Sequence, residues 1–298
     1  MVGTPGVSTS DQPPDPSPPA TAYAGKVVAF GTRHGKEQQL APAFAAVLQA
    51  AVVTPPDLDT DQFGTFDGET SRTLSPVDAA RAKARLAMAA LATPYGVASE
   101  ASYGPLPGLG VPGHEELLLF IDVERDLEVV EGERTLTTPA GRASVASLRE
   151  AQGFLTQAGF PAQAVIVRAS DADRHPIQKG ITDLDHLERA VQAAARRSDD
   201  GLALLEPDLR AQHNPTRRAL LTRLGRRLAQ RLATVCPACS SPGYGRISTR
   251  IGLPCAACGW PTDLVTADVH GCQRCHHQDR RPLRDTTAEP RWCDRCNP

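Results

Sequence analysis

The sequence lacks any long apolar run, and its first residues lack the pattern of a targeting signal. A transmembrane helix needs about 20 consecutive, mostly apolar residues, and no stretch of this chain approaches that length. The opening segment MVGTPGVSTSDQPP contains no charged segment followed by an apolar one, as a secretory signal would. The sequence therefore predicts neither a membrane partner nor secretion, and we expect a cytoplasmic protein.

Lysine and aromatic residues are also scarce. Aromatic residues make up 4% of the chain, and arginine supplies most of its 32 basic residues. The lysines are Lys26, Lys36, Lys83 and Lys179. Because most basic residues of this chain are arginines, a lysine can mark a site that needs a compact point charge. The alternative is that the four lysines persist by chance. The remaining composition, 41% hydrophobic and 22% charged with a net charge of -2, excludes a collagen, a coiled coil and a wholly disordered chain.

Cysteine is absent from the first 235 residues, and this absence divides the chain. Residues 1–22 are rich in proline, serine and threonine and predict a disordered leader. Residues 23–234 have the mixed composition of a packed core and predict an α/β, enzyme-like domain. Residues 235–298, rich in cysteine, glycine and proline, predict a separate module.

Strand-like and helix-like segments alternate through the predicted core domain. Short apolar or alternating runs predict strands at 26–30, 96–99, 116–122, 127–131, 164–168 and 202–205. Helical spacing and helix-start residues predict helices at 36–51, 77–91, 145–158, 183–197 and 215–234. The strands at 116–122 and 127–131 should pair as an antiparallel hairpin. The alternation indicates an α/β fold with a mixed sheet and helices on both faces, followed by a small zinc-ribbon-like module.

The cysteines of the tail form four Cys-x-x-Cys turns, which are Cys236/Cys239, Cys255/Cys258, Cys272/Cys275 and Cys293/Cys296. Such a turn holds two thiolates at the separation that tetrahedral Zn²⁺ needs, so eight sulfurs predict two structural zinc ions. The spacing favours sequential pairing of the first turn with the second and the third with the fourth. A crossed pairing, first with third and second with fourth, stays open. Disulfides are the alternative, and the lack of a secretion signal argues against them.

The predicted helix at 215–234 contains six arginines and no acidic residue; the arginines are Arg217, Arg218, Arg223, Arg226, Arg227 and Arg231. Together with the zinc tail, such a face could bind the phosphates of a nucleic acid. The alternative is that these arginines pair with acidic residues of the core, and the nearly neutral chain favours this alternative.

A glycine-containing loop, Gly31-Thr-Arg-His-Gly-Lys36, connects the first predicted strand to the first predicted helix. Backbone N–H groups of such loops converge where an anion can sit. Thr32, Arg33 and Lys36 add side-chain donors, so the loop predicts a phosphate site. The alternative is a plain tight turn.

Acidic residues occur at comparable places near the ends of predicted elements. Glu69 precedes the helix at 77–91, Glu100 follows the strand at 96–99, and Asp122 ends the strand at 116–122. If these carboxylates meet the loop at one edge of the sheet, they could hold Mg²⁺ or Mn²⁺ against a phosphorylated small molecule and orient a water for attack. Each acid alone fits a surface or capping role, so the hypothesis rests on their joint placement.

The order of these features resembles the inosine/xanthosine triphosphate pyrophosphatases over roughly residues 26–130. The shared features are a Thr-x-x-x-Lys loop after the first strand, a Glu-Thr pair before a helix, the segment Ala-Ala-x-x-Lys-Ala within that helix, and an acid after the next strand. The resemblance implies Mg²⁺-dependent hydrolysis of a nucleoside triphosphate. It places Thr32, Lys36 and Lys83 near the phosphates. It places Glu69 and Glu100 near the metal.

The whole chain resembles a group of uncharacterised bacterial proteins with a Gly-Thr-Arg-His-Gly-Lys-Glu opening, a Glu-x-Asp-x-Arg segment before Asn-Pro-Thr-Arg, and a cysteine-rich end. In this sequence the Glu-x-Asp-x-Arg residues are Glu206, Asp208 and Arg210. They lie at a predicted strand end, where α/β proteins often have sites; an ion-pair network is the alternative. We therefore expect a Mg²⁺-dependent hydrolase of a nucleotide or other phosphorylated substrate. The alternative is a non-catalytic zinc-ribbon protein that binds nucleic acid or protein.

Overall fold

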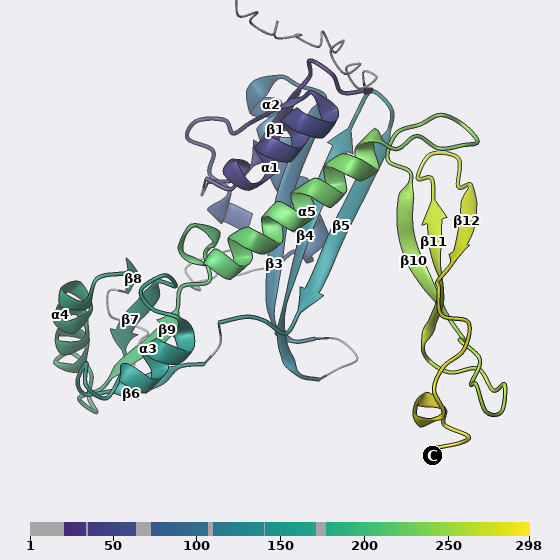
Figure 1. The fold of residues 1–298 in the computed structure, drawn as a ribbon. Coiled ribbons are helices and arrows are strands. Elements are labelled where there is room, and N and C mark those ends of the chain that lie inside the picture. Colours follow the sequence, from purple (N-terminus) through teal and green to yellow (C-terminus); the bar gives the residue numbers. More distant parts are fainter. Residues whose placement is uncertain (1–20, 34, 64–72, 107–109, 140, 171–176) are drawn as a thin grey trace, which may run out of the picture.

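The computed structural model describes residues 21–33, 35–63, 73–106, 110–139, 141–170 and 177–298. The predicted leader, residues 1–22, lies outside this part of the chain except for its last two residues. Of these, Thr21 donates a hydrogen bond from Oγ1 to the Leu48 carbonyl at 2.6 Å. The described strands form three sheets, and Figure 1 shows them as a central sheet, a smaller sheet beside it and a ribbon at the C-terminal end.

The central sheet contains five strands, in the spatial order β2 (Ala51–Val53), β1 (Val27–Gly31), β3 (Tyr95–Pro105), β4 (Pro112–Asp122) and β5 (Leu127–Thr135). β1 runs parallel to both β2 and β3, whereas β4 is antiparallel to β3 and β5 is antiparallel to β4. The predictions of a mixed sheet and of the β4–β5 hairpin are therefore confirmed.

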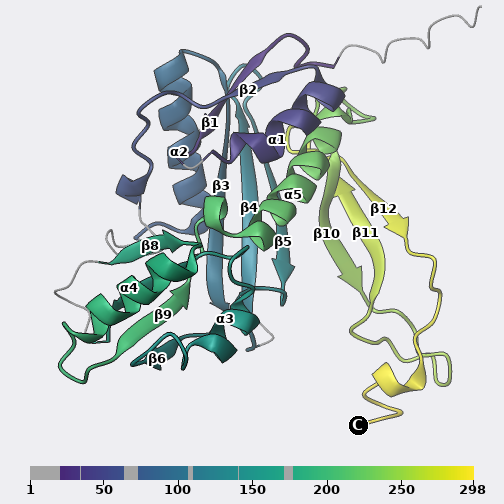
Figure 2. The same cartoon turned by 60° about the vertical axis from the view of Figure 1, so that its left-hand side comes forward.

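Helices cover both faces of this sheet, as predicted (Figure 2). They are α1 (Glu37–Ala43), which continues as a π-helical segment (Phe44–Leu48), α2 (Pro76–Leu91) and α5 (Pro215–Ala233). α1 and α5 pack on one face, where Val97 and Leu118 belong to their apolar core. α2 packs on the other face against Ala98 and Leu117. Because neighbouring residues of a strand point to opposite faces, β3 and β4 supply both cores.

Side-chain caps start the two longest helices. Ser75 accepts a hydrogen bond from the Asp78 backbone N–H at 3.2 Å, and Asn214 accepts one from the Arg217 N–H at 2.9 Å. A proline follows each cap at the first helical position, where its missing N–H costs nothing. Both helices begin within one residue of their predicted starts.

The strands between residues 143 and 207 form a second sheet, where the sequence predicted a single sheet. Its strands, all antiparallel, are β6 (Ala143–Val145), β9 (Ala203–Pro207), β7 (Val165–Ala169) and β8 (Gln178–Ile181), in spatial order. α3 (Gln152–Ala158) and α4 (Leu184–Ala195) belong to the same part of the chain. This sheet has its own apolar core, which includes Ile181 and Leu187. Short 3-10 turns lie at Asp61–Phe63 and Ala211–His213.

The tail forms a three-stranded antiparallel ribbon of β10 (Gly245–Ile251), β11 (Val265–Gly271) and β12 (Gln278–Pro282), followed by a 3-10 turn at Pro290–Trp292. The ribbon extends away from the central sheet, and its far end carries the C-terminus (Figure 1). None of the helices in the described ranges is both long enough and apolar enough to cross a bilayer.

Two glycines let α2 lie directly on the central sheet. A Cβ at Gly31 would lie 2.3 Å from the carbonyl oxygen of Lys83, and a Cβ at Gly96 would lie 2.5 Å from Cγ of Met88. Such distances are far shorter than van der Waals contact. The absence of a side chain at Gly31 therefore brings the Lys83 turn of α2 to the end of β1.

We expect Gly31→Ala to destabilise the protein by about 1–3 kcal/mol, because the added methyl group must push α2 off the sheet. Thermal unfolding should show a lower Tm for this variant. Gly153→Ala is the matched control, since a Cβ at Gly153 in α3 meets nothing within 4 Å and alanine favours a helix. Equal melting temperatures for the Gly31 variant and the wild type would contradict the close approach.

Candidate functional site

At the carboxyl end of β1, beside the middle of β3, the chain changes from one face of the central sheet to the other; Gly31 pairs with Ala98 there. β3 continues to Pro105, so Glu100 lies within the strand, and the prediction that it follows the strand is wrong because the strand extends to pair with β4. α1 follows β1 on one face, and α2 leads into β3 from the opposite face. Open α/β sheets bind ligands in the crevice outside strand ends at such a switch point. Three predicted site residues of the described chain, Lys36, Lys83 and Glu100, surround this position.

Lys36 reaches this position from the first face. It immediately precedes α1, is buried, and donates a hydrogen bond from Nζ to Ser99 Oγ on β3 at 3.1 Å. Burial, together with the positive charge of Arg217, lowers the pKa of Lys36 to about 7, while Glu116 and Glu100 act in the opposite direction. Thr32, the residue after β1, is buried as well.

Lys83 reaches the same position from the second face. Its ammonium group forms a short ion pair with the carboxylate of Glu100, and both side chains are buried. Because Ser99 and Glu100 are consecutive on β3 and point to opposite faces, they receive the two lysines from opposite sides. Lys83 and Glu100 both lie close enough to Lys36 to influence its pKa. The structure therefore places the two lysines and the acid at one short stretch of β3, with Lys36 on one face and the Lys83–Glu100 pair on the other.

A buried ion pair that sequence reasoning missed lies next to Lys36. Arg217 of α5 donates hydrogen bonds from Nε and a terminal nitrogen to the two oxygens of Glu116 on β4, at 2.7 and 3.1 Å. His114 lies 3.0 Å from the same carboxylate and stacks on Tyr103, with ring centroids 4.3 Å apart. Burial raises the pKa of Glu116, but Arg217 and His114 outweigh it and hold that pKa below its usual value.

The signal for this pair was present in the sequence in two separate places. Glu116 is an acid at the start of an apolar strand, and Arg217 belongs to the Asn-Pro-Thr-Arg segment. Nothing in the local pattern shows that these two segments meet, so Arg217 was grouped with the other arginines of its helix.

Two other predicted residues take different places. Arg33 is exposed and forms a long ion pair with Asp59 at 3.7 Å. With Thr32, Thr54 and Asp57 it lines a cavity of about 500 Å³ beyond the ends of β1 and β2. Glu69 lies outside the described residues, as does His34 of the loop.

Asp122 does not join this group, and its assignment beside Glu100 is wrong. It pairs with Tyr95 at the start of β3, whereas Glu100 pairs with Leu117. Tyr23 and Arg125 donate hydrogen bonds to the buried Asp122 carboxylate. The reason is strand direction: β4 runs antiparallel to β3, so its carboxyl end lies at the opposite edge of the sheet.

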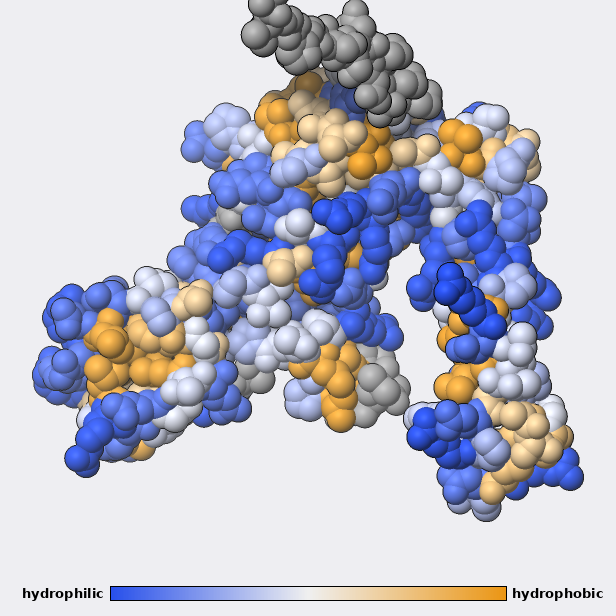
Figure 3. All heavy atoms as spheres, in the orientation of Figure 1, coloured by the Kyte–Doolittle hydropathy of each residue, from blue (hydrophilic) through white to orange (hydrophobic). Residues whose placement is uncertain are grey.

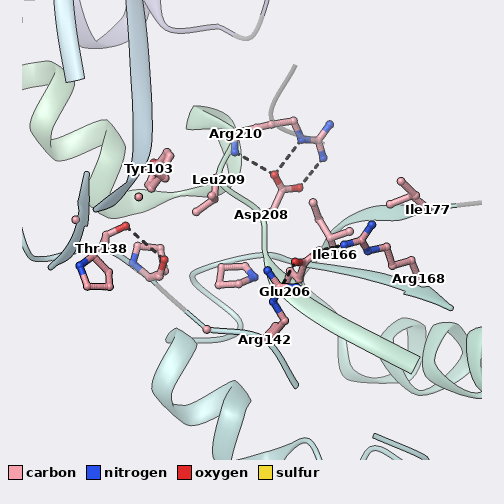
Figure 4. Close-up of a pocket in the computed structure, with 16 residues that line it drawn as sticks. Tyr103, Thr138, Arg142, Ile166, Arg168, Ile177, Glu206, Asp208, Leu209 and Arg210 are labelled. Carbon is pink, nitrogen blue, oxygen red and sulfur yellow. Dashed lines mark hydrogen bonds and ion pairs between the residues drawn. The ribbon is translucent and has the colours of Figure 1, made fainter. Parts of the chain in front are cut away.

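The second predicted polar cluster lines a cavity of about 670 Å³ between the β3–β4 hairpin and the second sheet. Asp208 is buried and forms an ion pair with Arg210 at 2.6 Å, and Glu206 contacts Arg168 at 3.0 Å. Figure 4 shows these side chains around the cavity, with Arg142 beside Glu206. The ion-pair network that the alternative expected is therefore present and borders a cavity. A binding role for this segment stays a prediction.

The cavity adjoins the buried Glu116–Arg217 pair. Tyr103 and Leu209 line its wall, and Arg217 donates a hydrogen bond to the Leu209 carbonyl at 3.0 Å. The Nε of Arg168 is buried and has no hydrogen-bond partner in the described chain. Arg168 is also one of the residues that line the cavity, where its terminal nitrogen contacts Glu206.

The eight cysteines form two groups of four, and the pairing is crossed. Cys236, Cys239, Cys272 and Cys275 make one group, and Cys255, Cys258, Cys293 and Cys296 make the other. Neighbouring sulfurs of the two groups lie 3.6–3.9 Å apart. A tetrahedral site with zinc–sulfur bonds of roughly 2.3 Å has sulfur–sulfur edges of about 3.8 Å, so both groups fit a zinc ion. These distances exclude disulfides.

The favoured sequential pairing is therefore wrong, and the ribbon explains why. β10 leads from the first turn to the second, β11 returns to the third beside the first, and β12 leads out to the fourth. Turns that alternate along the chain thus lie at the same end of the ribbon. Four sulfurs at each end leave no position for a catalytic water, which indicates structural sites.

Most arginines of α5 pair with acidic residues, as the alternative reading of that helix expected. Besides the Glu116–Arg217 pair, Arg223 contacts Glu133, Arg227 contacts Glu133 and Glu131, and Arg231 contacts Glu131. The use of this helix as a nucleic-acid surface stays a prediction.

Metal analysis should find about two zinc ions per chain, because each group of four thiolates fits one ion. The double variant Cys236→Ser/Cys272→Ser should lose one zinc, since both residues belong to one site. The matched variant Cys236→Ser/Cys255→Ser should lose both. If the first variant lost both ions and the second lost one, the crossed pairing would be refuted.

The comparisons with known proteins give one match. No curated protein and no solved structure matches the chain. A family model described as a domain of unknown function, DUF6671, matches residues 83–298. The matched part includes Lys83, Glu100, Glu116, Arg217 and all eight cysteines. Because this match covers well over half of the sequence, the chain belongs to the DUF6671 family.

Proposed function

We propose that the protein is a hydrolase of a nucleotide or another phosphorylated substrate, with its phosphate site at the switch point between β1 and β3. The observation that supports this proposal is the placement of Lys36 at Ser99 and of Lys83 at Glu100, two consecutive residues of β3 beside the end of β1. These residues, with Thr32, also carry the resemblance to the inosine/xanthosine triphosphate pyrophosphatases. Two lysines near the end of β1 suit a dianionic or more highly charged group.

The low pKa of Lys36 suits a site that gains its negative charge from the substrate. In the free protein, burial and Arg217 disfavour the charged lysine. A phosphate group bound beside it favours the ammonium form, so Lys36 takes up a proton as the substrate binds. Lys83 differs, because Glu100 already neutralises it within the protein.

Glu100 is the carboxylate of the described site that could contact a divalent cation. Mg²⁺ takes one or two protein carboxylates and completes its shell with substrate phosphates and water, so a single acid at this place is compatible with it. When bound, Mg²⁺ would neutralise the charge that develops on the leaving phosphate. In the proposed reaction, a water oxygen bonds to phosphorus as the bond to the leaving oxygen breaks. A carboxylate accepts the water's proton.

The cavity beside Tyr103 is the proposed place for the rest of the substrate. Tyr103 lies on the same face of β3 as Ser99, four residues further along the strand, which is roughly 13 Å. Arg142 and Arg168 on the far wall can donate hydrogen bonds to polar groups of a sugar or base.

The purified protein should release phosphate or pyrophosphate from at least one of a panel of nucleoside triphosphates, and only with Mg²⁺ or Mn²⁺ present. Glu100→Gln should lower kcat at least a hundredfold, because one of the few charged groups at the site is lost. Phosphate release can be followed with a colorimetric assay.

Glu100→Gln also leaves Lys83 as an unpaired buried charge, which is destabilising. The control is Lys83→Met/Glu100→Gln, which removes both charges and should recover stability but not activity. A double variant as active as the wild type would contradict the proposed site, and so would a wild-type protein that neither binds nor hydrolyses any nucleotide.

The affinity for a non-hydrolysable nucleoside triphosphate should fall as the pH rises above about 7, the pKa of Lys36, because the neutral amine no longer attracts phosphate. The loss should approach tenfold per pH unit. Calorimetric titrations over a series of pH values measure it.

Lys36→Met removes the titrating amine, so any pH dependence that remains in this variant comes from the titration of the ligand's phosphates. This variant should bind the nucleotide more weakly and with less pH dependence than the wild type. Lys36→Arg should also bind weakly, since the larger planar guanidinium does not fit the buried space of the lysine. Wild-type pH dependence in Lys36→Met would contradict the role of Lys36.

A further inference from the structure

A further polar cavity separates the central sheet from the ribbon. It measures about 670 Å³ and lies between β5 and α5 on one side and β10 to β12 on the other. Figure 3 shows a hollow between the two parts, bordered by hydrophilic residues on both sides. Its lining includes two glutamates, Glu131 and Glu133, and five arginines, which are Arg134, Arg227, Arg231, Arg246 and Arg281. Arginine therefore exceeds acid within the cavity.

The ion pairs of these arginines leave much of their charge accessible. Arg134 and Arg246 are 53% and 61% exposed in their pairs with Glu115 and Asp268. Exposed pairs of this kind contribute little net stability in water, so phosphate oxygens can compete for the guanidinium groups. Arg231 is different, because it is buried and serves the packing of the ribbon on the core.

The far end of the ribbon carries the only tryptophans of the sequence. Trp260 and Trp292 flank the second cysteine group and are 50% and 54% exposed. Arg295 lies over the Trp260 ring at 5.7 Å, and Arg291 lies over the Trp292 ring at 5.5 Å. Exposing two large aromatic rings beside arginines is the arrangement with which proteins stack unpaired bases and hold the adjoining phosphates.

We propose that the ribbon binds single-stranded nucleic acid, with phosphates in the arginine-lined cavity and bases stacked on Trp260 and Trp292. This inference is independent of the proposed hydrolase site, which lies at another part of the central sheet. The excess of arginine favours a polyanionic ligand. The exposed rings favour a polyanion with unstacked bases, which is a single strand, over a duplex or an acidic peptide. β10 links the two regions, since its seven residues span roughly 23 Å.

The test uses the full chain with fluorescein-labelled oligothymidine and oligouridine of about 20 nucleotides and a duplex of equal length. Fluorescence anisotropy measures binding over a range of salt concentrations. The tryptophan emission reports the ribbon tip alone, because both tryptophans lie there. We expect the single strands to bind more tightly than the duplex and to quench this emission. The two single strands separate a DNA from an RNA preference.

Two variants separate the contribution of base stacking from that of the phosphate contacts. Trp260→Ala/Trp292→Ala should weaken single-strand binding about fivefold or more, because stacking is lost. Arg246→Ala/Arg281→Ala should weaken it and reduce the slope of log affinity against log salt by roughly 1.4, as expected for two lost phosphate contacts. Arg189→Ala/Arg197→Ala removes the same charge from exposed positions near the second sheet and should bind like the wild type. Unchanged zinc content verifies folding.

Several outcomes would refute the proposal. These are no binding of either single strand at low salt, equal binding of the duplex without tryptophan quenching, or an equal loss in the control variant. A wild-type affinity in both ribbon variants would refute it as well.

Discussion

The fully buried ion pair between Glu116 and Arg217 holds together the parts of the molecule on which the candidate site depends. Two charges withdrawn from water are costly unless each fully satisfies the other, and here two parallel hydrogen bonds join them. Arg217 also ties the start of α5 to the Leu209 carbonyl, and His114 completes the carboxylate's contacts. The pair therefore fixes α5 on β4 and shapes a wall of the adjoining cavity. Its two members act on the pKa of Lys36 in opposite directions, because Arg217 lowers that pKa and Glu116 raises it, so burial is the main cause of the low value.

Features that depend on neighbouring residues could be predicted from the sequence. The hairpin of β4 and β5, the capped starts of α2 and α5, and the metal-binding cysteine turns each follow from a short local pattern. The grouping of Lys36, Lys83 and Glu100 was also predictable, because β1 and β3 are parallel neighbours and the end of β1 lies beside Ala98, two residues before Glu100. That argument needs only the order of elements and the direction of two strands.

Features that depend on contacts distant in the sequence could not be predicted. Glu116 and Arg217 are 101 positions apart, and a carboxylate in an apolar strand gives no sign of its partner. Asp122 was assigned to the wrong edge of the sheet. The sequence shows where a strand ends along the chain, but it does not show in which direction the strand runs within the sheet. The division of the strands between two sheets depends in the same way on which distant edges pair. Cysteine spacing gives the ligand count but not the partners, since the path of the ribbon decides which turns meet.

Because the two cysteine groups are crossed, they overlap along the chain, and the tail does not consist of two successive metal-binding modules. The first group closes a segment from Cys236 to Cys275, and the second closes an overlapping segment from Cys255 to Cys296. During synthesis no complete set of four thiolates exists until Cys275 has left the ribosome, and the second set waits for Cys296. The group next to the core, where Arg231 contacts Gly243, is thus the first that can take up metal. A chain clipped before Cys293 keeps that group whole, whereas a chain that ends before Cys272 has lost both.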